Sequence, residues 1–524
     1  MSSREIISAA QVDDRLFVLG DGKGGVPAPV SIDSQQIRAL NLVHALFELG
    51  KLKKDDGLCV VGAGFAGLTV AAYAAARGAR VTVLEKRVSP LKLQRECGHR
   101  WIQPYAVAWP EYSLDFADAN FPVLNWQAGL AQDVVAQVEW RWEALRARFD
   151  IQVETLVTGV RPEGSIVHYT DSSGTPRELR VAATVVAVGF GLEAHGSYWE
   201  EDGFEAPRLR GHLKFAIVGL GDGALADVLR IRLGKPEKWL TEAARLLEPM
   251  REELSDIENP LFLRQGEAFS EPLERGYEKL QPALMKALDP LFRHRIRSDT
   301  HVTLLGTEHS PFSARANALN RVLLWALLKM DTAGFQYVPI QKKSEPEEAG
   351  KNTVRYVDAS GTTKELTAHH LIRRFGPTEE TLKQQFPKLA EGLTGRQLVT
   401  GDRSVWVDGP ELALRPSDAS RDLVSMYIVL DEAELQRAKA KRFVDCRCAW
   451  WLEDRYARFL AENSHLVEHL IKLRERKDPR PPSGSGSPFN ACRVRIARER
   501  LDAVGSMFQV LDDFLIEFIP EDEP

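Results

Sequence analysis

The stretch LCVVGAGFAGLTVAAYAAARGARVTVLEKR, residues 58–87, decides the fold of this chain. Its first four residues form a short apolar run, which is typical of a buried parallel strand. Gly62-Ala63-Gly64-Phe65-Ala66-Gly67 follows as a complete G-x-G-x-x-G, then come an alanine-rich helix from Leu68 to Arg77 and a second strand from Ala79 to Glu85. Strand, glycine turn, helix and strand in this order predict a Rossmann-type dinucleotide-binding unit.

Each glycine of this turn has a mechanical reason. Gly62 allows the tight turn, Gly64 lets a diphosphate approach the backbone, and Gly67 lets helix and strand pack closely. The helix N-terminus offers unpaired N–H groups and a partial positive charge. A packing turn without a ligand is the alternative, but the register of strand, turn, helix and acid favours a nucleotide site.

An acid and two basic residues follow the second strand. Glu85 lies 21 residues after Gly64, where a carboxylate accepts hydrogen bonds from a ribose. Lys86 and Arg87 come directly after it. We expect these two side chains to contact the adenosine side of the nucleotide.

A second glycine turn stands in FAIVGLGDGALADVLRIRL, residues 215–233. Gly219-Leu220-Gly221-Asp222-Gly223-Ala224 gives G-x-G-x-x-A between a predicted strand and a predicted helix. The helix dipole favours Asp222, yet its carboxylate repels a diphosphate unless it turns away or contacts a ribose. The next strand of this unit is expected at His301–Gly306, beyond an insertion that is helical in pattern.

The two turns resemble those of the large flavoprotein superfamily with two dinucleotide-binding domains. In that superfamily the first unit holds FAD, and the second takes NADH or NADPH and presents the nicotinamide to the flavin. A long insertion, a β-meander and an apolar strand with a glycine-containing end follow the FAD turn. Here a predicted hairpin over 165–181 and TVVAVGFG, residues 184–191, stand in that order. The resemblance implies that Gly189 and Gly191 lie near the cofactor.

The resemblance extends in layout over about residues 55–410 and implies an α/β fold with two Rossmann-like units. We predict these segments: 1–54, a helical lead-in; 55–211, an FAD-binding domain with an aromatic insertion; 212–340, an NAD(P)-binding-like domain with a helical insertion at 235–300; 341–410, return strands; 411–524, a mostly helical C-terminal region. Glu308, just beyond the strand at His301–Gly306, would favour NADH over NADPH.

The implied function is that of an FAD-dependent oxidoreductase, with hydride transfer between NAD(P)H and the flavin and an unknown second substrate. Two alternatives stay open. One is a flavin-dependent oxidase or monooxygenase, and the other is a non-catalytic module that senses NAD(P)(H) and acts through a protein partner. The second turn is also open to interpretation as a scaffold without a ligand. No catalytic residue is identified.

Several other segments are candidates for the site. The aromatic stretch 96–126 is suited to wall a flavin pocket or to fill an irregular core, with Arg100, Gln103 or Tyr105 as polar contacts. Gly191 to Trp199 gives G-x-x-x-H-x-x-x-W, a string similar to one in Baeyer–Villiger monooxygenases. VTGDR, residues 399–403, is similar to a ribityl-binding segment of the flavoproteins. Arg373, Arg374 and Gly376 end a predicted strand, where α/β ligands often bind.

Composition narrows the class of protein. The chain has 524 residues, 44% hydrophobic and 27% charged, with a net charge of −6, so no basic excess points to nucleic acid. The start of the sequence has no signal-peptide core, and the uncharged run 58–76 is explained by the strand, turn and helix above. We expect a cytoplasmic protein with a small-molecule substrate and no membrane partner. The C-terminal region is open to contacts between copies of the chain or with another protein.

The cysteines favour no redox pair and no metal. Five cysteines without disulfide spacing indicate a reducing compartment. No C-x-x-C is present, and no histidine pair has ligand spacing, so no metal site is predicted. Cys446 and Cys448 fall in a predicted helix and are interpreted as structural residues.

Overall fold

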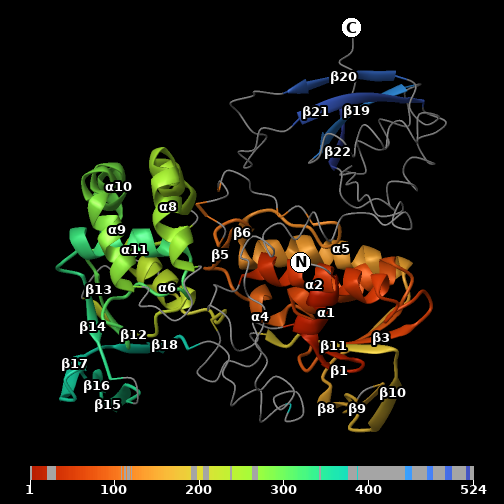
Figure 1. Ribbon diagram of the computed structural model, residues 1–524, viewed down its shortest axis with the longest axis horizontal. Helices are drawn as coiled ribbons and strands as arrows, with labels where there is room; N and C mark the ends of the chain where they lie inside the picture. Colours follow the sequence, from red (N-terminus) through yellow and green to blue (C-terminus); the bar gives the residue numbers. More distant parts are fainter. Residues whose placement is uncertain are drawn as a thin grey trace. The chain divides into compact units, whose positions relative to one another are not determined.

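The computed structural model (Figure 1) divides into two compact units, Met1–Leu114 with Ala128–Ala136 and Phe149–Gly409, and Asp115–Gln127 with Gln137–Arg148 and Pro410–Pro524. The described residues are 3–19, 31–107, 109–110, 114, 119, 121–163, 165–189, 198–204, 212–236, 239–262, 270–341, 344–375 and 386, with the backbone alone at 259–262 and in four strands between 443 and 519.

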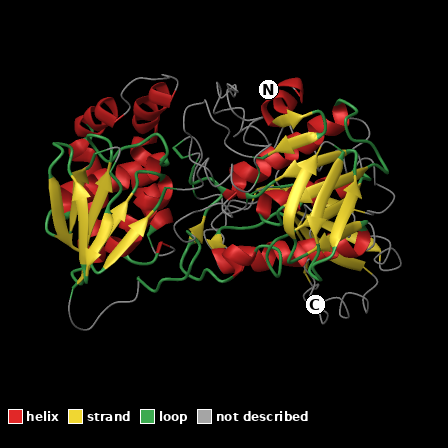
Figure 2. Ribbon diagram, turned by 90° about the horizontal axis from the view of Figure 1, so that it is seen from below, coloured by secondary structure: helices red, strands yellow, loops and turns green. Residues whose placement is uncertain are grey.

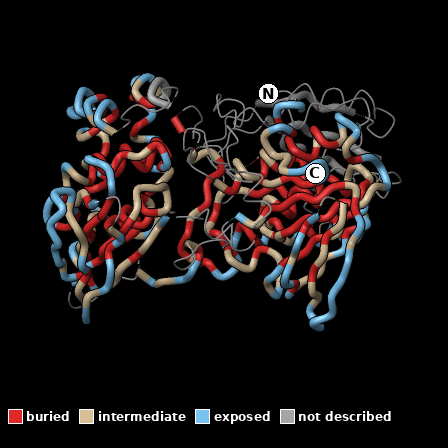
Figure 3. The backbone as a smooth tube through the Cα atoms, turned by 60° about the horizontal axis from the view of Figure 1, so that its bottom comes forward, coloured by how far each residue is buried: buried red, intermediate tan, exposed pale blue. Residues whose placement is uncertain are grey.

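The first parallel sheet lies in the first unit and is built around the glycine turn at residues 62–67. Its strand order is β1-β2-β11-β3-β4-β7, and all neighbours are parallel except β1 and β2. Its strands are β1 (Gln11–Asp13), β2 (Leu16–Val18), β3 (Gly57–Val61), β4 (Arg80–Leu84), β7 (Ile151–Glu154) and β11 (Ala183–Val186). Helix α3 (Phe65–Ala76) makes the crossover from β3 to β4. The central strands are apolar and buried, as the sequence predicts for a parallel sheet (Figure 3).

The lead-in before β3, predicted as helical, contains strands as well as helices, and its strands belong to this sheet. It contains helices α1 (Ser3–Ala10) and α2 (Ile32–Glu48), and α2 packs against both α1 and α3. A capping box formed by Ser31 and Ser34 begins α2. Strand β2 pairs in parallel with β11, so that Phe17 lies opposite Val185.

The hairpin that the sequence predicts is part of a three-stranded antiparallel meander. It consists of β8 (Thr158–Glu163), β9 (Ile166–Thr170) and β10 (Pro176–Arg180). Asp171 closes the turn between β9 and β10, because its carboxylate accepts hydrogen bonds from the amides of Ser173 and Thr175. The insertion before the meander contains α4 (Lys92–Arg95), β5 (Trp101–Ile102), β6 (Gly129–Leu130) and α5 (Ala131–Arg148).

The second parallel sheet has the strand order β14-β13-β12-β18. Its strands are β12 (Leu213–Val218), β13 (Thr300–Gly306), β14 (Phe335–Pro339) and β18 (His370–Arg373). Helices α6 (Asp222–Leu233) and α11 (Ala318–Met330) pack on it (Figure 2). The prediction that the second strand of this unit lies at His301–Gly306, after a helical insertion, is confirmed.

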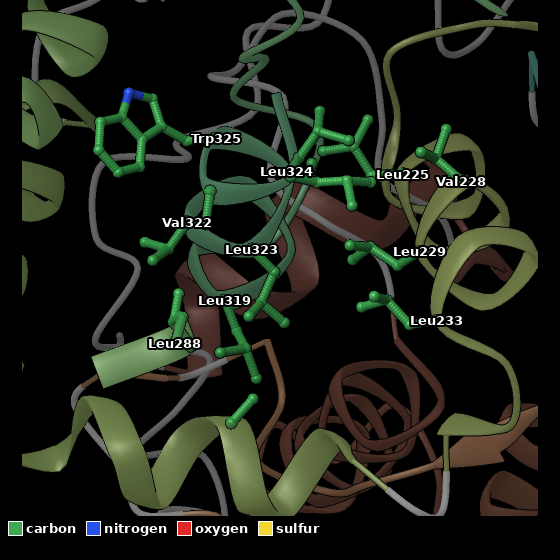
Figure 4. Close-up of a cluster of buried hydrophobic side chains, with 14 of the residues drawn as sticks. Leu225, Val228, Leu229, Leu233, Leu288, Leu319, Val322, Leu323, Leu324 and Trp325 are labelled. Atoms are coloured by element: carbon green, nitrogen blue, oxygen red, sulfur yellow. The ribbon is translucent and has the colours of Figure 1, made fainter. Parts of the chain in front are cut away.

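The insertion forms a helical layer over α6 and α11. It comprises α7 (Leu240–Leu247), the 3₁₀ turn η3 (Glu248–Met250), α8 (Arg251–Phe262), α9 (Ser270–Lys279) and α10 (Gln281–Arg295). Leu225 and Leu229 of α6, Leu319 and Leu323 of α11, and Leu288 of α10 share one core (Figure 4). An antiparallel sheet of β15 (Glu347–Gly350), β16 (Thr353–Val357) and β17 (Thr363–Thr367) precedes β18.

The described part of the C-terminal region is a four-stranded antiparallel sheet, where the sequence predicted mostly helix. Its strands are β19 (Phe443–Trp450), β20 (His469–Glu475), β21 (Asn490–Ala497) and β22 (Leu515–Ile519), in the order β20-β21-β19-β22. The prediction of a helix around Cys446 and Cys448 is therefore wrong. Alternation of apolar and polar residues through FVDCRCAW has the period of a strand, which outweighs the helix signal of its neighbours.

The prediction of an α/β fold with two Rossmann-like units is confirmed by the two parallel sheets and their crossover helices. Among the residues that the structure describes, none of the helices combines the length and the hydropathy of a bilayer-spanning segment.

Candidate functional site

The first glycine turn joins β3 to α3. Gly62 has a φ of +103°, and a Cβ built on it would lie 2.5 Å from the carbonyl oxygen of Ala187. A Cβ on Gly67 would lie 1.9 Å from the carbonyl oxygen of Gly62. Only glycine fits these two positions without a backbone shift. The turn therefore brings α3 close against the sheet.

Gly64 is the N-cap of α3, and the space in front of it is open. Its φ of −79° and ψ of −179° suit any residue, and a Cβ built on it meets no heavy atom within 4 Å. In the described part of the chain, the amides of Phe65 and Ala66 have no protein acceptor. Open space, unpaired amides and the positive end of a helix together fit the diphosphate of a dinucleotide.

Glu85 lies at the carboxyl end of β4, beside this turn. Its carboxylate is buried and accepts hydrogen bonds from the amides of Ala63, at 2.7 Å, and Arg87, at 2.8 Å. A carboxylate has further acceptor sites beyond these two, so it remains able to accept a ribose hydroxyl. Lys86 is exposed and Arg87 is half-buried, and both directly follow Glu85 in the sequence.

The end of β11 also reaches the first turn. The amide of Ala187 donates to the carbonyl oxygen of Val61 at 2.8 Å. Gly189 follows with a φ of +32° and no heavy atom within 4 Å of a Cβ built on it. Gly191 and the histidine of the G-x-x-x-H-x-x-x-W string lie outside the described residues, as do Gly376 and the VTGDR segment.

The second glycine turn repeats the backbone of the first. Gly219 has a φ of +128°, and a Cβ on it would lie 2.5 Å from the carbonyl oxygen of Arg374. Gly221 is the N-cap of α6, with a φ of −77° and a ψ of 172°, and the space in front of it is open. Ala224 is fully buried in the third small position. A Cβ on Gly223 would lie 3.1 Å from the ring of Tyr198.

The two turns differ at the position that Glu85 takes in the first. The amide of Gly62 donates to Leu84 in the first unit, and the amide of Gly219 donates to Leu305 in the second. This register places Gly306 where Glu85 stands, and Glu308 two residues beyond. A Cβ on Gly306 would lie 2.5 Å from a methyl carbon of Leu220, so an apolar side chain covers the position. The acid expected from the sequence, Glu308, is therefore not at this position, which is occupied by Gly306 and covered by Leu220.

Asp222 turns toward α11. Its Oδ1 accepts hydrogen bonds from the amide of Asn317 at 2.9 Å, from Nδ2 of Asn317 at 2.7 Å and from Nδ2 of Asn320 at 2.9 Å. Burial raises the pKa of Asp222, and the hydrogen bonds from Asn317 and Asn320 offset that rise only in part. The repulsion between this carboxylate and a diphosphate, anticipated from the sequence, is reduced because three donors bind the carboxylate.

A buried ion cluster, which the sequence did not reveal, lies next to the second turn. Asp227 of α6 is fully buried and accepts hydrogen bonds from Arg100, from Arg230 at 2.7 Å and from Arg374 at 2.7 Å. Burial alone would raise the pKa of Asp227, but the charges of the three arginines outweigh it and hold the pKa well below its usual range. We call these four residues the Asp227 cluster.

The Asp227 cluster joins segments that are far apart in the sequence. Arg100 comes from the aromatic insertion of the first half, and Arg374 follows β18 in the second. Arg100 also donates to the carbonyl oxygen of Tyr198 at 3.1 Å, and its guanidinium lies 3.9 Å from the centre of the Tyr198 ring. Arg230 donates to Asp202 at 2.9 Å. The cluster therefore fixes the first half of the unit against α6.

The polar residues of the aromatic stretch are engaged within the protein. Arg100 belongs to the Asp227 cluster, and Gln103 donates to the carbonyl oxygen of Leu114 at 2.7 Å. Trp109 is part of the hydrophobic core beneath α6 and α11. Tyr112 and Phe116 lie outside the described residues. Where it is described, this stretch serves as core and as a source of buried ion pairs.

Comparison with protein families gives one match. Residues 58–274 match the family model described as FAD dependent oxidoreductase. The matched region begins in β3 and includes both glycine turns, Glu85 and the Asp227 position. Among curated proteins, no relative matches the sequence.

The solved structures to which the chain is similar are distant in sequence. Bacillithiol disulfide reductase from Staphylococcus aureus is 13% identical, with 63% of this chain and 80% of that chain covered at a TM-score of 0.35. Thioredoxin reductase from Lactococcus lactis is 12% identical, with 63% and 81% covered at a TM-score of 0.32. The lysine monooxygenase of Nocardia farcinica is 12% identical, with 64% and 83% covered at a TM-score of 0.34.

Proposed function

We propose that this chain is an FAD-dependent oxidoreductase, because residues 58–274 match the family model of that description. In this proposal, NAD(P)H bound at the second glycine turn reduces FAD held at the first. A small molecule then takes the electrons from the reduced flavin. The few cysteines favour a cytoplasmic location for this reaction.

The observation that carries the proposal is the repetition of one backbone geometry at two helix N-termini. Gly64 and Gly221 are both N-caps with extended backbone and open space in front of them. A protein with one resident dinucleotide needs one such turn, whereas a flavin with a dissociable dinucleotide reductant needs two. The second turn therefore supports NAD(P)H as the partner of the flavin.

The residues of the first turn are suited to bind and orient the cofactor. FAD, when bound, supplies the two-electron redox chemistry. The amides at the start of α3 would hold its diphosphate, and Glu85 would accept hydrogen bonds from its adenosine ribose. The side chains of Lys86 and Arg87 would lie on the adenosine side. The Asp227 cluster would keep the two turns in one fixed arrangement.

The thiols of the described residues do not support a disulfide as the second substrate. Cys59 and Cys97 are both free and buried. Burial raises the pKa of each thiol, so both stay protonated near neutral pH. A thiol in that state is a poor nucleophile toward a disulfide.

A flavin-dependent oxidase is the second candidate, and one observation favours it. The amide of Asp222, which corresponds to the unpaired amide of Phe65, donates to the carbonyl oxygen of Arg315 at 3.2 Å. Because this amide is occupied and Gly306 stands where the first turn has Glu85, the second turn offers a dinucleotide fewer hydrogen-bonding groups than the first. An oxidase would be reduced by its organic substrate and not by NADH or NADPH.

Anaerobic reduction of the FAD-loaded protein tests the proposal. We expect NADH or NADPH to bleach the flavin absorbance of the wild-type protein. Gly221→Val should keep the flavin but slow the bleaching by at least about 100-fold, because the valine side chain fills the space that the nicotinamide dinucleotide's diphosphate needs while costing two hydrogen bonds to a charged group. Stopped-flow absorbance measures both rates, and circular dichroism checks that the variant is folded.

The possible results separate the candidates. A wild-type flavin that neither NADH nor NADPH bleaches contradicts the proposal and leaves the oxidase. Tight binding of NADH or NADPH without bleaching identifies a non-catalytic sensing module. Equal bleaching rates for Gly221→Val and wild type would place the reductant elsewhere.

A further inference from the structure

The loop from Thr307 to Asn317, here called the capping loop, covers the start of α6. It follows β13 and leads into α11. Its Arg315 carbonyl oxygen accepts the hydrogen bond from the Asp222 amide, at 3.2 Å. The corresponding amide of the first turn, that of Phe65, has no acceptor among the described residues. The capping loop therefore occupies a donor that a diphosphate at the second turn would use.

Side chains fix the end of the capping loop to the second turn. Asn317 caps α11, because its side chain accepts from the amide of Asn320 at 2.8 Å. The same Asn317 donates twice to Asp222, and Asn320 adds a third donor. Asp222 thus binds the start of α11 to the start of α6. These contacts hold the Arg315 carbonyl in its position over the turn.

The helical insertion supports the capping loop from behind. Arg321 of α11 is fully buried and donates to the carbonyl oxygens of Ser313, at 3.0 Å, and Ala316. Its guanidinium also pairs with Glu258 of α8, and Tyr277 of α9 donates to the same carboxylate. All three side chains are fully buried. The insertion, Arg321 and the capping loop therefore form one continuous hydrogen-bonded support.

We propose that the capping loop is a latch that closes the second glycine turn and must open before NAD(P)H binds. This inference rests on the proposed function, because it concerns the same turn. In the closed state, the loop carbonyl takes the place of a diphosphate oxygen at the Asp222 amide.

A closed latch lowers the measured affinity for the dinucleotide. Only the open fraction of the protein binds, so the apparent dissociation constant is the intrinsic constant divided by that fraction. A substitution that weakens the closed state without touching the turn backbone should tighten binding. This direction is the opposite of what loss of a binding residue would give, and it separates a latch from a ligand contact.

Asn320→Ala is the variant that tests the latch. It removes the Asn320 donor to Asp222 but keeps the backbone amide that Asn317 caps. The two hydrogen bonds from Asn317 to the Asp222 carboxylate also remain, so the repulsion between this carboxylate and a diphosphate changes little. We expect about tenfold tighter binding of NADH or NADPH to the FAD-loaded protein, the shift given by loss of one hydrogen bond to a charged group in the closed state. Hydrogen exchange of amides in residues 307–317 should become faster. Calorimetric titration and exchange mass spectrometry measure the two effects.

Gln336→Ala is the matched control. Gln336 donates from its amide to Thr303 at 2.9 Å in the same sheet, away from the second turn. It should change neither the dinucleotide affinity nor the exchange of the capping loop. Asn320→Ser, which keeps a small polar side chain, replaces Asn320→Ala if the alanine variant does not fold.

The outcomes distinguish the latch from the proposed function. Faster exchange of the capping loop with tighter dinucleotide binding supports the latch. Faster exchange with unchanged or weaker binding, in a protein whose wild type is bleached by NAD(P)H, overturns the latch and leaves the function intact. Unchanged exchange and unchanged affinity overturn the latch as well. Faster exchange with no binding of NADH or NADPH to either protein overturns both.

Discussion

Gly64→Val is expected to give a folded protein that no longer binds FAD. The backbone at Gly64 has a φ of −79° and a ψ of −179°, which valine adopts without strain, and a Cβ built there meets no heavy atom within 4 Å. The valine side chain would instead fill the space in front of the α3 amides. Loss of about two hydrogen bonds to a charged diphosphate lowers the affinity for FAD by at least about 100-fold.

The matched control for this prediction is Gly221→Val. Gly221 has nearly the same backbone conformation and the same open space, but it belongs to the second turn. The purified Gly221→Val protein should therefore retain flavin absorbance, whereas Gly64→Val should be colourless with an unchanged circular dichroism spectrum. Titration with FAD, followed by flavin fluorescence, measures the affinities. Full flavin content in folded Gly64→Val would move the flavin site away from the first turn.

Asp227→Asn is expected to lower the free energy of unfolding by about 3–5 kcal/mol, the cost of breaking a buried ion pair by removing one partner. Asparagine keeps the size of the side chain but removes the charge that Arg100, Arg230 and Arg374 share. The three guanidinium groups would then be buried without their common carboxylate. Denaturant unfolding, monitored by tryptophan fluorescence, measures the change.

The stability that Asp227 contributes should depend on pH in one direction. The pKa of Asp227 is lower in the folded protein than the value of about 3.9 for a free aspartate. Ionised Asp227 therefore stabilises the fold fully above that pH, and the stabilisation is lost as the pH falls below about 4. Asp227→Asn lacks this contribution at every pH. The difference in stability between wild type and variant should narrow on acidification below about pH 4.

An exposed ion pair is the control for the Asp227 cluster. Glu178 and Arg180 pair on the surface of the meander, and Glu178→Gln should leave the unfolding free energy unchanged within error. A difference between wild type and Asp227→Asn that stays constant from pH 7 to about pH 3 would contradict the titration argument. An unchanged stability at pH 7 would contradict the cluster's role altogether.

Local pattern was enough to predict both glycine turns and their strands. The apolar runs before Gly62 and Gly219 bury on both faces, and the small residues that follow are dictated by close backbone contacts. In the first unit, the strand, the glycine turn, the helix, the second strand and Glu85 all lie within residues 57–85, so their spacing is visible in the sequence. The second unit was harder, because a helical insertion separates β12 from β13. Its apolar run at His301–Gly306 still marked the strand.

Contacts between distant segments were not visible in the sequence. Asp227 meets Arg100 and Arg374 only after the chain has folded, and each residue alone is typical of a solvated helix or loop. The pairing of Asp222 with Asn317 is of the same kind. Glu308 was misplaced for a further reason, since strand register, and not distance along the chain, decides which residue faces the ribose.

The parallel pairing of β2 with β11 joins two strands that are translated at very different times. Phe17 is synthesised long before its partner Val185, and β2 has no parallel partner until the whole meander and then β11 have been translated. During translation, the apolar strand β2 is therefore present before its partner β11. Such long-range pairing slows folding, and it leaves the apolar side chains of β2 unburied in the growing chain until β11 is made.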